Sequence, residues 1–187
     1  ITQNPTAFPA AAANGGTYTV KVTDNAGCTA SASTTVIVKP LPVISAASNS
    51  PVCTGGTILL NATPSGGSGT FTTFQWSGPN SFSSVLEDPA GFPAILAASG
   101  TYTVTVTDNA GCTKSGTTSV SVSGLPTITA TLLGPVCTSG TVALGSTPTG
   151  GSGIYSAFQW SGPNGYSASV EDPAAFPVTP AVVGTYT

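Results

Sequence analysis

One stretch of the chain recurs at a fixed interval and constrains the fold more than any other feature. GTYTVTVTDNAGC runs from Gly100 to Cys112, a nearly identical copy runs from Gly16 to Cys28, and GTYT returns at Gly184–Thr187. The copies lie 84 residues apart. Self-similarity at a fixed period indicates an array of similar structural units. We therefore predict the C-terminal part of one repeat over 1–40, a complete repeat over 41–124, and the N-terminal part of a third over 125–187.

An alignment without gaps supports this division. Leu41–Thr103 and Leu125–Thr187 are identical at 36 of 63 positions. The identities cluster in Gly- and Pro-rich turns and at aromatic positions. Because both outer parts are incomplete, we expect the sequence to be a window of a longer array.

The residue pattern within a repeat predicts β-structure. In Thr101–Thr107 large or apolar residues alternate with Thr, the period of a half-buried strand, and Asp108–Gly111 then supplies turn residues. Evenly spaced short segments of this kind predict an all-β fold of tandem immunoglobulin-like antiparallel β-sandwiches. The predicted strands are Val43–Ala47, Thr57–Ala62, Phe74–Ser77, Phe82–Val85, Ala94–Ala97, Thr101–Thr107 and Thr117–Val122, with Thr34–Val38 in the first repeat.

Two aromatic residues are the predicted core anchors of each sandwich. Trp76 lies on the third predicted strand, where immunoglobulin-like sandwiches bury an indole, and Tyr102 follows a Gly-Thr corner that suits a tyrosine corner. Trp160 and Tyr186 are their counterparts in the third repeat. A Pro at position 180 replaces Leu96, so we expect the strand there to be short or irregular.

The composition excludes several classes of function. Only 5% of the residues are charged, and three cations cannot form a basic surface for nucleic acid. The absence of His rules out Ser-His-Asp and Cys-His catalysis, so we predict a non-enzyme with no cofactor. No apolar run within this window is long enough to span a membrane.

The chain has four cysteines. Cys28 and Cys112 occupy equivalent positions of the repeat, and so do Cys53 and Cys137. An intradomain Cys53–Cys112 bond is the simplest alternative, but immunoglobulin topology places these residues at opposite poles, about 20 Å apart for a strand of this length. The competing hypothesis is a disulfide between neighbouring repeats. Either arrangement implies an oxidising, extracellular setting.

Two further groups of residues are candidate ligand sites. Glu87, Asp88 and Asp108 could contribute to a weak Ca²⁺ site, although Asp-Pro more often starts a turn. Aromatic residues in or beside Gly/Ser loops could contact sugars or other surfaces, or seal contacts between repeats or chains; these are Phe71, Phe82, Tyr155 and Tyr166.

The motifs VCxGxxxxL, FQWSGPN, DP and GTYTVTVTDNAGC together resemble the Ig-like, PKD-like repeats of large secreted surface proteins of Bacteroidota, including gliding-type adhesins and other cargo of the type IX secretion route. The resemblance spans the whole chain and implies an extracellular stalk or adhesin array at the cell surface. Our main interpretation is a structural protein whose partners are neighbouring repeats, or identical chains in a filament. The alternatives are a module binding glycans or surfaces, and an accessory region of a secreted enzyme.

Overall fold

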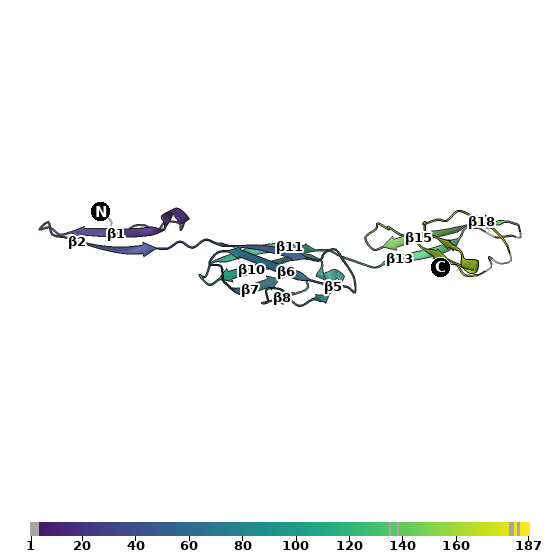
Figure 1. The fold of residues 1–187 in the computed structure, drawn as a ribbon, viewed down its shortest axis with the longest axis horizontal. Helices are drawn as coiled ribbons and strands as arrows, with labels where there is room; N and C mark the ends of the chain where they lie inside the picture. The colour runs from purple at the N-terminus through teal and green to yellow at the C-terminus, as the bar shows by residue number, and fades with distance from the viewer. Residues whose placement is uncertain (1–3, 135, 138, 180–181, 183) are drawn as a thin grey trace. The chain divides into compact units, whose positions relative to one another are not determined.

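The computed structural model describes residues 4–134, 136–137, 139–179, 182 and 184–187. Within these residues the secondary structure consists of β-strands and three short 3-10 helices (Figure 1). The chain divides into two compact units that interleave along the sequence. The first unit comprises residues 1–49, 59–91 and 100–120, and the second comprises residues 50–58, 92–99 and 121–187.

The first unit begins with a separate β-hairpin. The 3-10 helix η1 (Ala12–Asn14) precedes β1 (Gly16–Thr23), which pairs antiparallel with β2 (Thr29–Val36) from Gly16↔Val36 to Thr23↔Thr29. Every residue of both strands is exposed. The Tyr18 hydroxyl donates to the Asn14 carbonyl at 2.9 Å, the local bond of a tyrosine corner.

The rest of the first unit is a β-sandwich. One layer is a four-stranded sheet in the order β11-β10-β7-β8, and the other is the antiparallel pair β3–β6. β3 also packs against β10 and β11, and the Thr118 hydroxyl donates to the Ser48 hydroxyl at 3.4 Å. The bounds are β3 (Pro42–Ser48), β6 (Leu60–Gly66), β7 (Phe71–Ser77), β8 (Ser83–Ser84), β10 (Gly100–Asp108) and β11 (Thr113–Val120).

The sandwich core follows the alternation of β10. Tyr102, Val104 and Val106 are fully buried, whereas the Thr residues between them remain partly exposed. In the β10–β7 pairing Val104 lies opposite Trp76, which is 2% exposed. Burying these side chains contributes about 1.5–3 kcal/mol for each aliphatic residue and more for the indole. The strand pattern therefore directs both the fold and its main apolar contacts.

The second unit contains several two-stranded pairs. β4 pairs parallel with β12, and the pairs β5–β9, β13–β15, β14–β18 and β16–β17 are antiparallel. Val142, Leu144 and Trp160 form a small buried cluster. The bounds are β4 (Val52–Cys53), β5 (Thr57–Ile58), β9 (Phe92–Pro93), η2 (Leu96–Ala98), β12 (Val122–Ser123), β13 (Pro126–Leu132), β14 (Thr141–Val142), β15 (Leu144–Gly150), β16 (Trp160–Ser161), η3 (Pro163–Gly165), β17 (Ser167–Ala168) and β18 (Phe176–Pro177).

The fold class is as predicted: an all-β chain of tandem immunoglobulin-like sandwiches. Three local predictions are wrong. The predicted strand Thr57–Ala62 is divided into β5 and the beginning of β6. The predicted strand at Ala94–Ala97 is replaced by β9 and the 3-10 helix η2, because Ala98 and Ser99 donate backbone bonds to the Ile95 and Leu96 carbonyls. The last predicted strand is split into β11 and β12, and β12 pairs parallel rather than antiparallel. The prediction at Pro180 lies outside the described residues.

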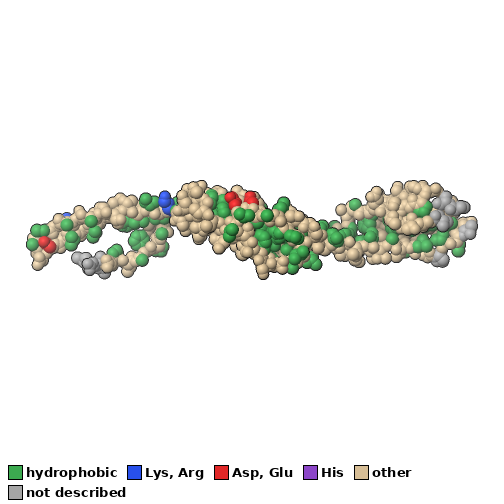
Figure 2. Space-filling model, turned by 90° about the horizontal axis from the view of Figure 1, so that it is seen from below, with side chains coloured by type: hydrophobic (Ala, Val, Ile, Leu, Met, Phe, Trp, Pro, Cys, Tyr) green, Lys and Arg blue, Asp and Glu red, His purple; other side chains and the backbone are tan. Residues whose placement is uncertain are grey.

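Charge is sparse on the molecular surface. On the face drawn in Figure 2, charged side chains form only small patches, and most of the surface is neutral. In the part of the chain that the structure describes, no helix has the length and apolar character needed to cross a membrane.

Candidate functional site

The turn after β10 is fixed by one carboxylate. Asp108 is 1% exposed. Its Oδ1 accepts backbone N–H bonds from Ala110 at 3.0 Å and Cys112 at 2.8 Å, and its Oδ2 accepts the Ser68 N–H at 2.9 Å. The Asn109 N–H donates to the Thr70 carbonyl at 2.9 Å. These bonds attach the β10–β11 turn to the loop between β6 and β7.

The same bonds determine the ionisation of this carboxylate. Burial of Asp108 acts to raise its pKa, but the N–H groups of Cys112, Ser68 and Ala110 hold the pKa below its ordinary value. Hydrogen bonds donated to the charged form favour that form. Asp108 is therefore an ionised structural anchor at neutral pH.

The β1–β2 hairpin has the same turn with fewer partners. Asp24 Oδ1 accepts the N–H groups of Ala26 at 2.9 Å and Cys28 at 2.8 Å. Within the described residues, Asp24 Oδ2 has no counterpart of the Ser68 bond. The hairpin therefore forms the same local turn through Asp24 Oδ1.

The recurring Ser-Gly-Pro-Asn turn supports the aromatic anchors. A Cβ on Gly78 would collide with the Tyr102 ring, and Gly162 stands in the same relation to Tyr186. Asn80 and Asn164 have positive φ values of 53° and 60°, a left-handed conformation that Asn tolerates. The Trp76 indole N–H donates to the Glu87 carbonyl at 3.0 Å, which satisfies its only polar atom. Burial raises the pKa of Tyr102.

The aromatic residues proposed for surface contacts are half-buried. The Phe82 ring packs edge-on against Tyr102 with centroids 5.3 Å apart, and Tyr166 packs in the same way against Tyr186 at 5.4 Å. The Tyr155 hydroxyl donates to the Gly150 carbonyl at 2.9 Å. Phe71 is in β7, opposite Asp108. Phe82 and Tyr166 therefore cover the core tyrosines Tyr102 and Tyr186.

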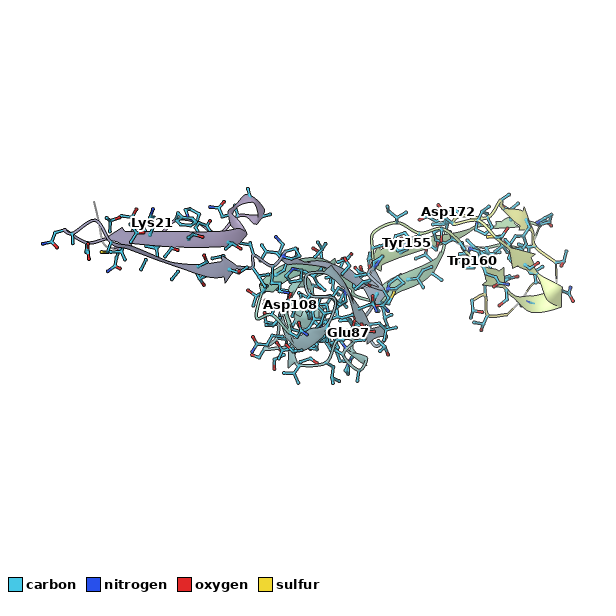
Figure 3. The ribbon with its side chains drawn as sticks, turned by 60° about the vertical axis from the view of Figure 1, so that its left-hand side comes forward. Lys21, Glu87, Asp108, Tyr155, Trp160 and Asp172 are labelled. Atoms are coloured by element: carbon cyan, nitrogen blue, oxygen red, sulfur yellow. The ribbon has the colours of Figure 1, made fainter. Side chains whose placement is uncertain are left out.

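The carboxylates proposed for Ca²⁺ serve separate hydrogen-bond networks. Asp88 Oδ1 accepts from the Asn61 side chain at 2.9 Å and the Ala62 N–H at 3.0 Å, whereas Asp108 binds its own turn. Figure 3 shows Glu87 and Asp108 in the sandwich of the first unit. Among the described residues, no cluster of three or more His, Cys, Asp or Glu side chains could hold a metal ion. The geometry brings no Ca²⁺ ligand set together at these carboxylates.

All four cysteines lie among the described residues and are free thiols. Cys53 is in β4 and pairs with Ser123 of β12, directly before the chain passes to β13. Cys112 follows the turn that Asp108 fixes. Gly67 lies beside that turn, and a Cβ on Gly67 would lie 3.3 Å from Pro42, the first residue of β3. Cys28 and Cys137 are exposed. In the second unit Cys53 therefore lies where the chain passes from β12 to β13, and in the first unit Cys112 lies at the β10–β11 turn.

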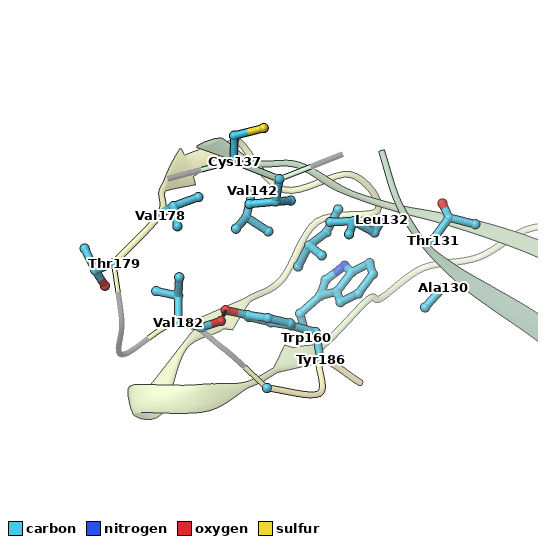
Figure 4. Close-up of a pocket in the computed structure, with 13 residues that line it drawn as sticks. Ala130, Thr131, Leu132, Cys137, Val142, Trp160, Val178, Thr179, Val182 and Tyr186 are labelled. Carbon is cyan, nitrogen blue, oxygen red and sulfur yellow. Dashed lines mark hydrogen bonds between the residues drawn. The ribbon is translucent and has the colours of Figure 1, made fainter. Parts of the chain in front are cut away.

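An apolar groove opens beside Trp160 in the second unit. A cavity of about 650 Å³ is lined by residues that include Leu132, Leu144, Trp160 and Tyr186 (Figure 4). A second cavity of about 410 Å³ is lined in part by Ile128, Phe158 and Trp160. Trp160 lines both cavities, and we refer to the two together as the Trp160 groove.

Comparisons with known proteins yield structural neighbours only. No family model matches the chain, and no curated protein matches it. The N-terminal eight Ig domains of Down Syndrome Cell Adhesion Molecule isoform 1.30.30 give a TM-score of 0.44 at 20% identity, over 79% of this chain and 23% of that one. A 1.5-MDa bacterial ice-binding adhesin gives a TM-score of 0.42 at 21% identity, over 82% of this chain and 58% of that one.

Sequence reasoning missed the anchoring role of Asp108 and the Trp160 groove. The repeated Asp-Asn-Ala-Gly-Cys motif was a signal for the first, since a carboxylate at this place can accept the N–H groups that follow it. The second had no comparable signal in the pattern of apolar residues.

Proposed function

We propose that this protein is a structural, extracellular repeat protein that serves as a stalk, adhesin shaft or surface filament. The observation that carries the proposal is the Asp108 anchor, which ties the β10–β11 turn to Ser68 close to the Pro42 end of the sandwich. The repeated sequence and the short Pro-Leu-Pro connection favour a mechanical role. We also propose that the repeats have the boundaries 1–40, 41–124 and 125–187.

Single-molecule stretching of the chain, tethered at both ends, tests this proposal. Unfolding of one complete repeat of 84 residues should release at most about 300 Å of chain in one discrete event, because each residue spans up to 3.6 Å. Asp108→Asn should lower the force of that event, and Glu87→Gln, on an exposed carboxylate, should leave it unchanged. A chain that extends smoothly without such an event would contradict a mechanical role.

A glycan array separates the structural role from carbohydrate binding. The packing of Phe82 on Tyr102 and of Tyr166 on Tyr186 disfavours recognition of sugars by these rings. Binding that is specific, saturable and lost in Phe82→Ala or Tyr166→Ala variants that still melt cooperatively would favour the binding-module alternative. If the chain is an inert shaft, we expect no glycan on the array to bind.

We propose further that neighbouring repeats are joined by disulfides. Cys53 lines a cavity of about 340 Å³ together with Gly151 and Ser152. These are the counterparts of Gly67 and Ser68, which contact Asp108 in the turn that leads to Cys112. The next repeat would therefore bring its own Cys112-type turn to Cys53. Such a bond would limit bending between repeats and suits an oxidising environment.

A further inference from the structure

We propose that Asp88 and Pro64 close the outer edge of β6 and thereby keep two copies of this chain from pairing strand against strand. The proposal rests on the stalk function proposed above and adds how neighbouring copies meet: strand addition to the sandwich is blocked, so each stalk remains a separate chain. It gives a role to the Glu-Asp-Pro motif, which the sequence repeats at 87–89 and 171–173.

The outer edge of β6 is the place where a further strand could add. β6 pairs antiparallel with β3, and within the described residues this pair carries no third strand. In such a pair the backbone groups of alternate residues face the same edge. The Ala62 N–H donates to Asp88 and so faces away from β3, and the next residue that faces this way is Pro64. An open row of backbone groups is a template for a strand of another chain.

Both of these positions are without a free donor. Asp88 Oδ1 accepts the Ala62 N–H at 3.0 Å and also the Asn61 side-chain amide at 2.9 Å. Pro64 has no N–H to donate. An incoming strand would have to displace the carboxylate at Ala62 and would find only a carbonyl acceptor at Pro64. It would therefore lose part of the ladder of hydrogen bonds that a regular edge supplies.

The sandwich core holds Asp88 in this place, although Asp88 itself is exposed. On one side of it in the sequence, the Glu87 carbonyl accepts the Trp76 indole N–H at 3.0 Å. On the other side, Pro89 is buried. Because both neighbours are fixed by buried groups, the carboxylate is directed at the edge of β6 by the fold of the domain.

The second unit repeats this arrangement at the edge of β15. Asp172 Oδ1 accepts the Ser146 N–H at 3.0 Å, and the next residue facing the same edge is Pro148. The Trp160 indole again donates to the carbonyl before the aspartate, that of Glu171, at 3.2 Å. The residue whose N–H is bound is Ala in the first unit and Ser in the second. The shared feature is therefore the backbone bond, which is what closing an edge requires.

The other edges of the sandwich offer little regular strand. At the end of the four-stranded layer, β8 has only two residues. β7 carries a bulge, because Thr73 lies opposite Thr107 and Phe71 opposite Asp108, which leaves Thr72 without a counterpart in β10. On the other side of the sandwich β3 packs against β11. Short strands and bulges hinder strand addition. β6, with seven residues, is the regular edge that needs a specific closure.

Light scattering after size exclusion, together with amide hydrogen exchange, tests the proposal on the full 187-residue chain. Pro64→Val/Asp88→Ala frees both positions of the edge. We expect the mass of this variant to rise above 18.2 kDa, towards twice that value, as its concentration is raised to several hundred micromolar. Its β6 amides should exchange more slowly at high concentration, whereas those of the wild type should not change. Exchange in β6 decides the test, because contacts elsewhere on the chain leave this strand unchanged.

Two matched variants separate an open edge from a loss of stability. Asp88→Asn keeps a carbonyl oxygen that can accept the Ala62 N–H, so its β6 exchange should be independent of concentration. Gly78→Ala crowds the Tyr102 ring in the same sandwich and leaves the β6 edge closed, so it should behave in the same way. If Gly78→Ala gains as much protection in β6 as the double variant, instability explains the association and the proposal is wrong.

Two further outcomes would overturn the proposal. One is a Pro64→Val/Asp88→Ala chain that melts cooperatively and whose β6 exchange does not depend on concentration. The other is a wild-type chain whose β6 amides become protected as it is concentrated. Pro64→Val and Asp88→Ala alone each free one position and should give a smaller effect, so they replace the double variant if it does not fold. The stretching experiment on single chains does not depend on these results, so the stalk function is tested separately.

Discussion

Asp108 accepts the backbone N–H of Ser68 at 2.9 Å, although 40 residues separate the two. This bond joins the β10–β11 turn to the β6–β7 loop, and the same carboxylate also fixes the turn through Ala110 and Cys112. A short turn and a Gly-rich loop are thus joined at one end of the sandwich. A joined end of this kind suits the array of repeats proposed above.

The Asp108 anchor should make the sandwich sensitive to acid. The folded-state pKa of Asp108 lies below its ordinary value of 3.8, so its ionised form stabilises the fold fully above that value. This contribution is lost as the pH falls through the lower, folded-state pKa. In Asp108→Asn one carboxylate oxygen is replaced by an NH₂ group, which cannot accept a hydrogen bond, so the melting temperature should be lower at pH 7. The amide does not titrate, so the melting temperature should also depend less on pH below about 4. Calorimetric melts between pH 7 and 2 measure both effects, and Glu87→Gln is the control.

Removing the indole anchor should threaten the whole sandwich. Trp76 is 2% exposed, lies opposite Val104 and donates to the Glu87 carbonyl. Trp76→Ala leaves a large cavity and should cost about 3–5 kcal/mol of unfolding free energy, a major part of the stability of a small domain. Urea denaturation followed by circular dichroism measures this loss. A midpoint equal to that of the wild type would remove Trp76 from the core.

The glycine before Pro79 should be intolerant of any side chain. A Cβ on Gly78 collides with the Tyr102 ring, so Gly78→Ala should destabilise the sandwich by about 1–3 kcal/mol through overpacking. Gly124→Ala is the matched control, because a Cβ there meets no atom within 4 Å. Thermal melts of the two variants compare a crowded and an open glycine in one chain. Equal shifts of the melting temperature would mean that backbone entropy, rather than the contact with Tyr102, determines the effect of both substitutions.

The elements that could be predicted from the sequence are those set by local alternation. β10 follows from the Tyr102, Val104 and Val106 pattern, because a period of two places these residues on one face wherever the strand lies. The tyrosine corner follows from the same local geometry, and Tyr186 makes it by donating to the Val182 carbonyl at 2.7 Å. Local pattern fixed these features without information from distant residues.

The elements that sequence reasoning missed depend on distant partners. Ile95 and Leu96 are apolar enough for a strand, but the chain turns there into η2 and β12 lies beside it. β12 pairs parallel with β4, and its partners Val52 and Cys53 come from a distant part of the chain. A local pattern therefore could not predict this pairing. Asp108 looked like a turn residue or a Ca²⁺ ligand, since its bond to Ser68 exists only in the folded sandwich.

The proposed link between neighbouring repeats predicts a specific disulfide in a chain that contains both ends of the junction. The test extends the chain after Thr187 with a copy of residues 104–124, which brings the cysteine of the Asp108-type turn into the third repeat. Because Cys53 lines a cavity with Gly151 and Ser152, oxidation by glutathione disulfide should join Cys53 to that added cysteine with a loss of two protons and two electrons. Peptide mapping by mass spectrometry identifies the pair. Cys112→Ser should leave the bond intact, and a peptide joining Cys53 to Cys112 would replace the link between repeats with one inside a repeat.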